Sequence, residues 1–304
     1  MDYAFSYSKF LKDFLKPKKK LKVVFDCSNG TTGFVLKKLF GGNKLVEAIF
    51  INDKPDGNFS AHGPNPLAEG ADSQLRTEVR KLGADLGIIF DADGDRVFFV
   101  DNRGRTVEAH EIGYILMKMF KPPYVAGINS SWRIKKFSGV KSASGGRQVL
   151  ISRVGHYFFK KIMRGKNASL GVEHSGHYYF KKFFYCDSGI LAAIEIINFI
   201  SGLKKDFADW LDYLPKFYRS GEINFEVSDK EEIMKKIEKV YKDTAKKISK
   251  MDGLTMEFKV GGAEWWFNVR PSNTENLLRL NLESGDKKIF KKELKNLEDL
   301  MFLE

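Results

Sequence analysis

The chain contains little cysteine and no long uninterrupted apolar run, and both features limit what it can be. Only Cys27 and Cys186 occur among its 304 residues, in unrelated contexts, so we expect neither a disulfide framework nor a cysteine-based zinc site. The most apolar stretch, 189–200, includes Glu195 and Asn198 and is too short to span a bilayer. The N-terminus has no signal-peptide core. These features predict a cytoplasmic protein with no membrane-spanning segment.

Acidic residues are outnumbered by basic ones. Lysine and arginine together number 51 against 39 aspartates and glutamates, a net charge of +12. Such a charge favours an anionic partner, either a phosphorylated small molecule or nucleic acid. Lysine pairs such as Lys37-Lys38 are scattered along the chain without a nucleic-acid-binding motif. We therefore interpret them as a solvated surface and expect no nucleic-acid partner.

Strand and helix patterns alternate over the first two thirds of the chain, which is long enough for two or three domains. Alternation of this kind is typical of βαβ units with largely parallel sheets. From about residue 204 the pattern changes to a helix at 230–250, three strands and a closing helix from 287. We predict two related mixed α/β domains, 1–106 and 107–203, followed by a smaller α+β domain, 204–304, with an antiparallel sheet.

The apolar run 86–90, which predicts a buried strand, is followed by Asp91, Asp93 and Asp95, spaced two apart. Carboxylates this close repel one another unless a proton or a cation neutralises them, and oxygen ligands suit Mg²⁺ best, with Ca²⁺ or Mn²⁺ next. An EF-hand loop is excluded, because Arg96 and Asn102 stand where it needs glycine and glutamate. A solvated acidic turn is the alternative. Arg96 argues against it, since a guanidinium beside a metal loop is well placed to grip phosphate.

The segment 171–180 carries Glu173, Ser175 and His177 at every second position. In an extended loop this spacing would aim the three side chains the same way. An acid, a hydroxyl and an imidazole together suit the hydroxyl groups of a sugar. A hairpin edge with incidental polar residues explains the pattern equally well.

The segment 270–279 passes from one predicted strand to the next through a polar turn. Arg270 offers a charged planar fork, and Ser272, Asn273 and Thr274 offer neutral donors, which together describe a phosphate cradle. The alternative is an ordinary polar turn, because serine, asparagine and threonine are common turn formers.

Another candidate is His156, which follows Gly155 at the start of a predicted helix. Its imidazole could donate to phosphate or transfer a proton. The simpler interpretation is a hydrogen-bonding residue at a helix start.

Six ordered segments carry a resemblance to a known family. They are CSNGTTG (27–33), PDGNFSAHGPNP (55–66), DADGDR (91–96), RVGH (153–156), GVEHSGHYYF (171–180) and RPSNTENLLR (270–279). In this order they resemble the α-D-phosphohexomutases, the phosphomannomutase and phosphoglucomutase family. Members of that family have three related α/β domains and a smaller C-terminal α+β domain around a deep cleft. This chain resembles the second, third and fourth domains.

The resemblance implies movement of a phosphoryl group between C1 and C6 of a hexose through a bisphosphorylated intermediate. It implies Mg²⁺ as cofactor, with mannose or glucose 1- and 6-phosphates and a hexose 1,6-bisphosphate as ligands. The implied metal ligands are Asp91, Asp93 and Asp95, and the implied catalytic residues are Arg96 and His156. The implied substrate-binding residues are Glu173, Ser175, His177, Arg270, Ser272, Asn273 and Thr274.

One departure from the family governs the expected activity. Family members carry a phosphoserine in their first domain, which is both the phosphoryl donor and the fourth metal ligand. The nearest similar segment here, Ser60-Ala61-His62, belongs to the second-domain motif by its order and neighbours. We therefore expect a split or truncated mutase that is inactive alone and needs a separate polypeptide carrying the serine domain. A non-catalytic phosphosugar-binding protein derived from the same fold is the alternative.

Overall fold

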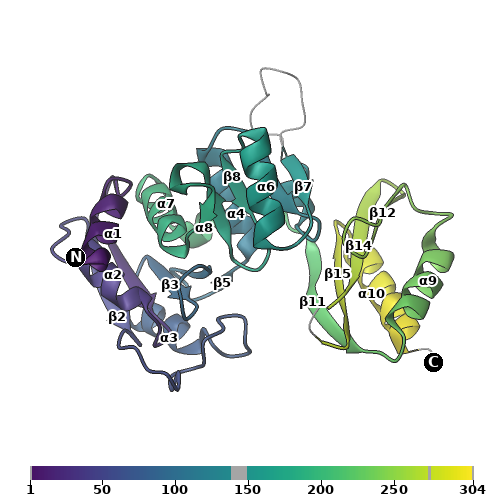
Figure 1. Ribbon diagram of the computed structural model, residues 1–304, viewed down its shortest axis with the longest axis horizontal. Helices are drawn as coiled ribbons and strands as arrows, with labels where there is room; N and C mark the ends of the chain where they lie inside the picture. The colour runs from purple at the N-terminus through teal and green to yellow at the C-terminus, as the bar shows by residue number, and fades with distance from the viewer. Residues whose placement is uncertain (1, 138–148, 273–274, 303–304) are drawn as a thin grey trace. The chain divides into compact units, whose positions relative to one another are not determined.

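The strand before the aspartate loop, β3 (Leu86–Phe90), is buried at every residue and lies at the centre of a five-stranded sheet. The computed structural model describes residues 2–137, 149–272 and 275–302. It divides the chain into two compact units, Met1–Leu214 and Pro215–Glu304 (Figure 1). None of the helices in the described ranges is both long and apolar enough to cross a membrane.

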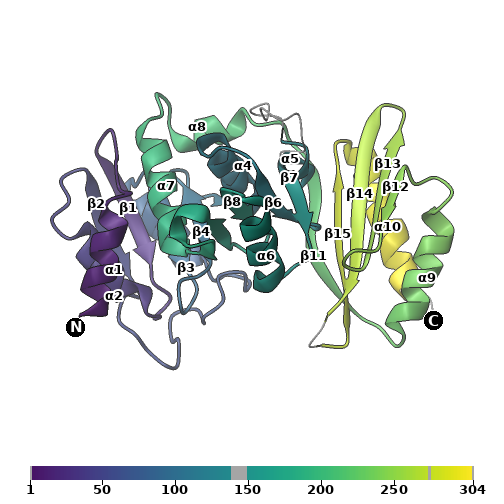
Figure 2. The same cartoon turned by 45° about the horizontal axis from the view of Figure 1, so that its top comes forward.

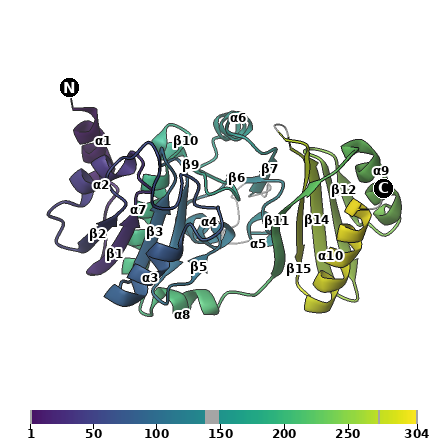
Figure 3. The same ribbon diagram turned by 90° about the horizontal axis from the view of Figure 1, so that it is seen from below.

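The first sheet of unit one has the order β2-β1-β3-β4-β5, with the first three strands parallel and the last two antiparallel. Its other strands are β1 (Leu21–Asp26), β2 (Val46–Ile51), β4 (Val97–Asp101) and β5 (Thr106–Val107). Its helices are α1 (Tyr3–Lys12), α2 (Thr32–Phe40) and α3 (Ser73–Leu82), and α1 lies beside α2 in Figure 3. Ile88 and Phe90 face the core that includes α2, whereas Ile89 faces the core beneath α3. Burial on both faces explains why β3 is a continuous apolar run.

The second sheet repeats this plan with the order β10-β9-β8-β6-β7, in which β6, β7 and β8 are parallel and β9 and β10 antiparallel. Its parallel strands β8, β6 and β7 are labelled in Figure 2. Its strands are β6 (Tyr124–Gly127), β7 (Val149–Ser152), β8 (Leu170–Val172), β9 (Tyr178–Phe180) and β10 (Cys186–Asp187). Its helices are α4 (Ala109–Met119), α5 (Trp132–Lys135), α6 (His156–Lys166), the 3-10 turn η1 (Lys181–Phe183), α7 (Gly189–Ser201) and α8 (Phe207–Asp212). The prediction of two related mixed α/β sheets is confirmed.

Helix α7 is buried along almost its whole length. Its Leu191 and Ile194 belong to the same core cluster as Phe99 of the first sheet and Tyr178 of the second. A helix that is apolar all round must be covered all round, and here the cover comes from both sheets. One continuous core therefore joins the two sheets into a single unit.

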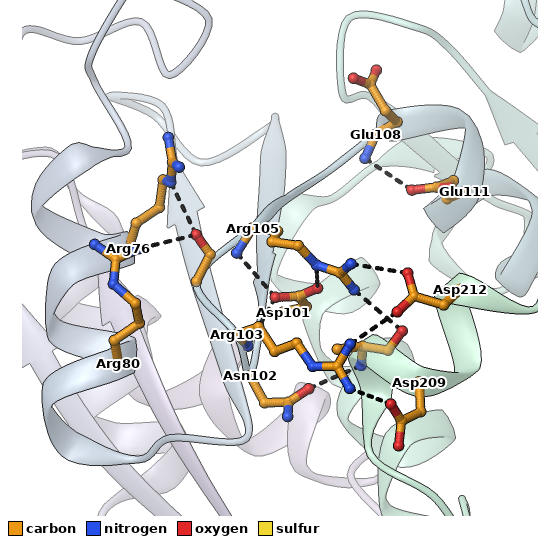
Figure 4. Close-up of polar contacts among 12 residues, drawn as sticks. Arg76, Arg80, Asp101, Asn102, Arg103, Arg105, Glu108, Glu111, Asp209 and Asp212 are labelled. Atoms are coloured by element: carbon orange, nitrogen blue, oxygen red, sulfur yellow. Dashed lines mark hydrogen bonds and ion pairs between the residues drawn. The ribbon is translucent and has the colours of Figure 1, made fainter. Parts of the chain in front are cut away.

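Ion pairs connect the turn after β4 to α8 (Figure 4). Arg105 contacts the buried Asp101 at 2.7 Å and Asp212 at 2.9 Å. Arg103 contacts the other oxygen of Asp212 at 2.9 Å and also pairs with Asp209. Exposed pairs contribute less than about 1 kcal/mol each, so this network orients α8 more than it stabilises the unit.

Unit two is a five-stranded antiparallel sheet of order β11-β15-β14-β13-β12, which confirms the predicted α+β domain with an antiparallel sheet. Its strands are β11 (Tyr218–Glu226), β12 (Lys247–Ser249), β13 (Leu254–Val260), β14 (Ala263–Pro271) and β15 (Leu277–Ser284). Its helices are α9 (Lys230–Tyr241) and α10 (Lys287–Phe302). Ile237 of α9 and Leu297 of α10 are fully buried in one core with Phe267 of β14.

The predicted helix at 230–250 is too long. Helix α9 ends at Tyr241, and residues 247–249 form the edge strand β12, in which Ile248 is paired with Met256. Ile248 lies between polar residues, which is the alternation expected of a strand. The lysines around it make the same segment resemble the exposed end of a helix, although lysines are also common on edge strands. The first strand of this sheet, β11, was not predicted.

The segment between β2 and α3 is tied to the first sheet through Asp26, which is fully buried. Asp26 accepts from the backbone N–H of Ser28 at 2.9 Å and from Asn52 Nδ2 at 3.0 Å, and its Oδ2 lies 3.1 Å from His62 Nε2. The hydrogen bond to Asp26 raises the pKa of His62 above its ordinary value. The ion pair therefore anchors this segment best when His62 is protonated.

Substitution His62→Gln should make folding stability less dependent on pH. Because the folded-state pKa of His62 is raised, its contribution is fully present below the unfolded pKa of about 6.5 and is lost as pH rises through the folded value. Urea unfolding should show the wild type more stable than the variant by about 1 kcal/mol at about pH 5.5 and by less at about pH 8.5. An equal difference at both pH values would contradict this assignment.

Candidate active site

Two turns from the two sheets of unit one meet through their backbones. The turn at 91–96 joins β3 to β4, and the turn at 173–177 joins β8 to β9. Arg96 and His177 form an antiparallel bridge, and Val97 N–H donates to Gly176 O at 3.2 Å. These bonds fix the aspartate loop against the polar hairpin turn.

Glycine permits this close approach at two positions. Gly176 has φ +91°, and a Cβ built on it would lie 2.6 Å from the Phe98 ring. Gly189 at the start of α7 donates its N–H to Gly94 O at 3.2 Å, and a Cβ there would lie 2.7 Å from that same oxygen. A larger residue at Gly176 would clash with Phe98 of β4, and one at Gly189 would push the start of α7 away from the aspartate loop.

Asp91 organises its own loop. The side chain is buried; its Oδ1 accepts from the N–H groups of Gly94 at 3.0 Å and Arg96 at 3.1 Å, and its Oδ2 accepts from Arg96 Nε at 2.6 Å. Burial raises the pKa of Asp91, although the bonds from Arg96 oppose that change. Arg96 Nη1 also donates to Asn65 Oδ1 at 3.2 Å, so the guanidinium is held from two sides.

The predicted metal ligands lie together. Asp91, Asp93 and Asp95 each place a carboxylate oxygen within 4.8 Å of the other two. Hydrogen bonding to His177 lowers the pKa of Asp95 to about 2, so this carboxylate is ionised at neutral pH. Asp93 is exposed, which leaves a path for solvent. An all-oxygen set that solvent can reach fits Mg²⁺, which keeps several of its waters when bound.

Glu173, Ser175 and His177 also lie together, but the expected extended loop is wrong. Glu173 N–H donates to His177 O at 3.0 Å, which closes a tight hairpin turn between β8 and β9. The side chains meet at the imidazole of His177, whose Nδ1 lies 2.9 Å from Ser175 Oγ and 3.5 Å from Glu173 Oε2. The turn, and not a period of two, produces the cluster.

Glu173 is buried and connects this hairpin to the start of α6. It accepts from Tyr179 OH at 3.0 Å and from the Gly155 N–H at 3.2 Å. Burial raises the pKa of Tyr179, and the negative charge of Glu173 adds to the effect. The carboxylate thus holds His156, the next residue after Gly155, at the edge of the same cluster.

His156 is paired with an acid that the sequence did not single out. Its Nδ1 lies 3.2 Å from Asp187 Oδ2, while Lys160 Nζ lies 3.3 Å from Asp187 Oδ1. Burial acts to raise the pKa of Asp187, but pairing with His156 outweighs it and the pKa is lowered. The same pair raises the pKa of His156. The only sequence signal for Asp187 is its position just before the Ser-Gly start of an apolar helix.

The predicted phosphate cradle belongs to unit two. Arg270 Nη2 donates to Glu222 Oε2 at 2.9 Å, and Arg279 Nη1 donates to Glu222 Oε1 at 3.2 Å. Arg279 also donates to Ser272 Oγ at 3.3 Å, which places Ser272 beside the pair. Asn273 and Thr274 lie outside the described residues. Glu222 and Arg279 were not anticipated, because their partners are set by pairing across β11, β15 and β14.

Glu222 acts as an internal counter-ion. Burial acts to raise its pKa, but the charges of Arg270 and Arg279 outweigh burial and lower the pKa. The cradle residues are therefore neutralised within the unit.

Substitution Glu222→Ala should destabilise unit two, because it leaves two guanidiniums without their shared carboxylate. The expected loss is about 1–3 kcal/mol of unfolding free energy, measured by urea denaturation. Lys235→Ala, at an exposed ion pair on α9, is the matched control and should change stability by less than about 0.5 kcal/mol. Equal effects of the two substitutions would rule out this role for Glu222.

Models of one protein family match this chain along most of its length. Models of the phosphoglucomutase/phosphomannomutase family match three consecutive parts of the chain: alpha/beta/alpha domain II at residues 5–104, alpha/beta/alpha domain III at 109–218 and the C-terminal domain at 222–300. The chain belongs to this family. The metal-capable loop lies in the match to domain II, and His156 and His177 lie in the match to domain III.

The relatives of this chain include proteins named phosphomannomutase. The chain is 37% identical to that of Methanocaldococcus jannaschii over 297 residues, covering 97% of this chain and 64% of the relative. It is 35% identical to that of Escherichia coli over 274 residues, covering 88% and 59%. The chain thus spans about three fifths of the length of these relatives.

Solved structures share the fold. A phosphoglucomutase/phosphomannomutase family protein from Burkholderia thailandensis superposes with a TM-score of 0.84 at 22% identity, covering 98% of this chain and 64% of the other. An N-acetylphosphoglucosamine mutase of Aspergillus fumigatus, solved with GlcNAc-6P and magnesium, gives a TM-score of 0.66 at 13% identity, covering 98% and 69%.

Proposed function

We propose that this chain provides the metal, sugar and distal-phosphate sites of a phosphohexomutase that moves a phosphoryl group between C1 and C6 of a hexose phosphate. The observation that carries the proposal is the meeting of the aspartate loop with the His156 and His177 turns. Carboxylates for a cation, a guanidinium for phosphate and imidazoles for proton transfer lie in one place, as phosphoryl transfer requires.

Each side chain has a proposed task. Asp91, Asp93 and Asp95 would hold Mg²⁺, which when bound neutralises charge on the phosphoryl group. Arg96 is held by Asp91 through its Nε and by Asn65 through its Nη1, so its Nη2 is the nitrogen best placed to bind phosphate oxygens. His156, whose pKa the pairing with Asp187 raises, would donate to phosphate or to the leaving oxygen.

Sugar and distal-phosphate recognition are assigned to the other predicted residues. Ser175 and His177 offer a hydroxyl and an imidazole at the turn, and the buried carboxylate of Glu173 lies next to that imidazole. Arg270, Ser272, Asn273 and Thr274 would bind the phosphate that is not being transferred. A phosphate there would compete with Glu222 for Arg270, so binding exchanges one anion for another.

The proposed substrates are hexose 1- and 6-phosphates, of glucose or mannose. Relatives of this chain are named phosphomannomutases, and an Aspergillus fumigatus mutase of the same fold was solved with glucose 1,6-bisphosphate. The chemistry also needs a phosphoserine. We propose that a first-domain polypeptide outside residues 1–304 provides it.

Complementation tests this proposal. Activity on mannose 1-phosphate or glucose 1-phosphate, with a hexose 1,6-bisphosphate activator, should rise at least about 100-fold when a serine-bearing first domain from a relative is added, because the donor is then positioned in the site. A first domain with its serine changed to alanine is the control. No rescue by any such polypeptide would reject the split-mutase proposal. Hexose phosphate binding without rescue would favour a non-catalytic phosphosugar-binding protein.

Mg²⁺ affinity should depend on phosphate. Three protein carboxylates, one already engaged by Arg96, leave the ion short of ligands, so we expect weak binding to the protein alone and at least about tenfold tighter binding with a phosphosugar. Calorimetric titration with and without hexose 1,6-bisphosphate measures this difference, with Asp93→Asn as the variant that should lose it. Tight Mg²⁺ binding to the protein alone would contradict the expectation.

A further inference from the structure

A second group of metal-capable side chains lies beside the aspartate loop. Asp95, His156, His177 and Asp187 each offer one ligand atom, and all four atoms lie within 4.8 Å of one another. They come from four places in unit one: the β3–β4 turn, the start of α6, the β8–β9 turn and the end of β10. Only Asp95 is shared with the proposed Mg²⁺ site.

The spacing of these atoms suits tetrahedral coordination. His156 Nδ1 lies 3.2 Å from Asp187 Oδ2, and His177 Nε2 lies 3.4 Å from Asp95 Oδ2 and 4.0 Å from Asp187 Oδ2. Tetrahedral zinc with bonds of about 2.0–2.1 Å holds neighbouring ligand atoms about 3.3–3.4 Å apart. Small side-chain movements would complete this geometry.

Neighbouring groups orient the ligand atoms. His177 Nδ1 faces Ser175 Oγ at 2.9 Å and Glu173 Oε2 at 3.5 Å, so Nδ1 can hold the imidazole proton when Nε2 exchanges its hydrogen bond to Asp95 for a metal ion. A carboxylate behind a histidine ligand is the usual arrangement around bound metal, because it fixes the tautomer.

Asp187 turns a buried carboxylate oxygen toward the cluster. Its side chain is only 7% exposed, and its Oδ2 is buried without a well-aligned hydrogen bond. Lys160 contacts the other oxygen, Oδ1, at 3.3 Å and leaves Oδ2 facing the two imidazoles. At present this oxygen is paired with the His156 imidazole at 3.2 Å, and a metal ion between the two would replace the imidazole proton as the compensating positive charge.

We propose that Asp95, His156, His177 and Asp187 form a second cation site that takes a borderline transition-metal ion, of which Zn²⁺ is the type case. Two imidazoles with two carboxylates suit Zn²⁺, whereas Mg²⁺ prefers oxygen ligands alone. Because Asp95 belongs to both sets, Zn²⁺ at this site withdraws a ligand from Mg²⁺. Zn²⁺ would therefore weaken Mg²⁺ binding and take His156 out of proton transfer.

Direct binding tests this site without any hexose phosphate, so its outcome is independent of mutase activity. Zn²⁺ should bind the wild-type chain with one ion per chain, and Co²⁺ should give the intense visible absorption of a tetrahedral site. His156→Ala and Asp187→Asn should each weaken Zn²⁺ binding at least about 100-fold and abolish that absorption, since even outer-sphere changes cost 10–100-fold. Circular dichroism of each variant verifies that it is folded.

Two matched variants locate the ion. Asp93→Asn removes a carboxylate of the aspartate loop alone, and His62→Gln removes a histidine paired with Asp26 elsewhere in the unit. Both should keep Zn²⁺ affinity within about threefold of the wild type if the proposed four residues hold the ion. Zn²⁺ binding that survives both His156→Ala and Asp187→Asn would overturn the proposal. The proposal would also be overturned if Asp93→Asn weakened Zn²⁺ binding as much as His156→Ala does. An absorption spectrum typical of octahedral Co²⁺ would contradict it as well.

Discussion

The site depends on the backbone pairing between two turns. The bridge between Arg96 and His177, with the bond from Val97 N–H to Gly176 O, joins a turn of the first sheet to a turn of the second. These are main-chain contacts, so they hold regardless of the rotamers of the charged residues around them. These backbone contacts fix the chain next to Asp95 and at His177, and so bring the two side chains together.

Charge compensation is the second constraint, and it operates within each unit. Asp91 is neutralised by Arg96, and Asp187 by His156 and Lys160. In unit two, Arg270 and Arg279 share Glu222. Removing one partner from a buried pair costs more than the pair itself contributes. If a phosphate or a cation binds at these residues as we propose, it would have to replace an existing partner and supply equivalent charge.

Much of the fold could be predicted from local patterns. The apolar run 86–90 gave β3 at its observed bounds, and alternation of strands and helices indicated the mixed sheets. The helix at 230–250 was overextended, because lysines flanking Ile248 suit an exposed helix and an edge strand alike. Local periodicity does not distinguish these two, and pairing with β13 decides between them.

The site was predictable where its residues stand close in sequence. The spacing of Asp91, Asp93 and Asp95 predicts a cation site, because three neighbouring carboxylates repel one another unless a cation neutralises them. Asp187 and Glu222 could not be found in this way, since each acquires its partners only through packing of distant segments. The grouping of Glu173, Ser175 and His177 was expected from a period of two, yet a hairpin turn produces it. The three side chains do lie together, but for a different physical reason from the one that the sequence suggests.

The central claim is that the aspartate loop and the histidine turns form one centre for a cation and a phosphate. Anomalous diffraction from crystals of this chain with Mn²⁺, a substitute for Mg²⁺ that is visible at its absorption edge, and hexose 1,6-bisphosphate tests it most directly. The account predicts one strong peak between Asp91, Asp93 and Asp95, with a phosphate oxygen within hydrogen-bond distance of Arg96. A peak away from these carboxylates, or a bisphosphate that does not contact Arg96, would contradict it.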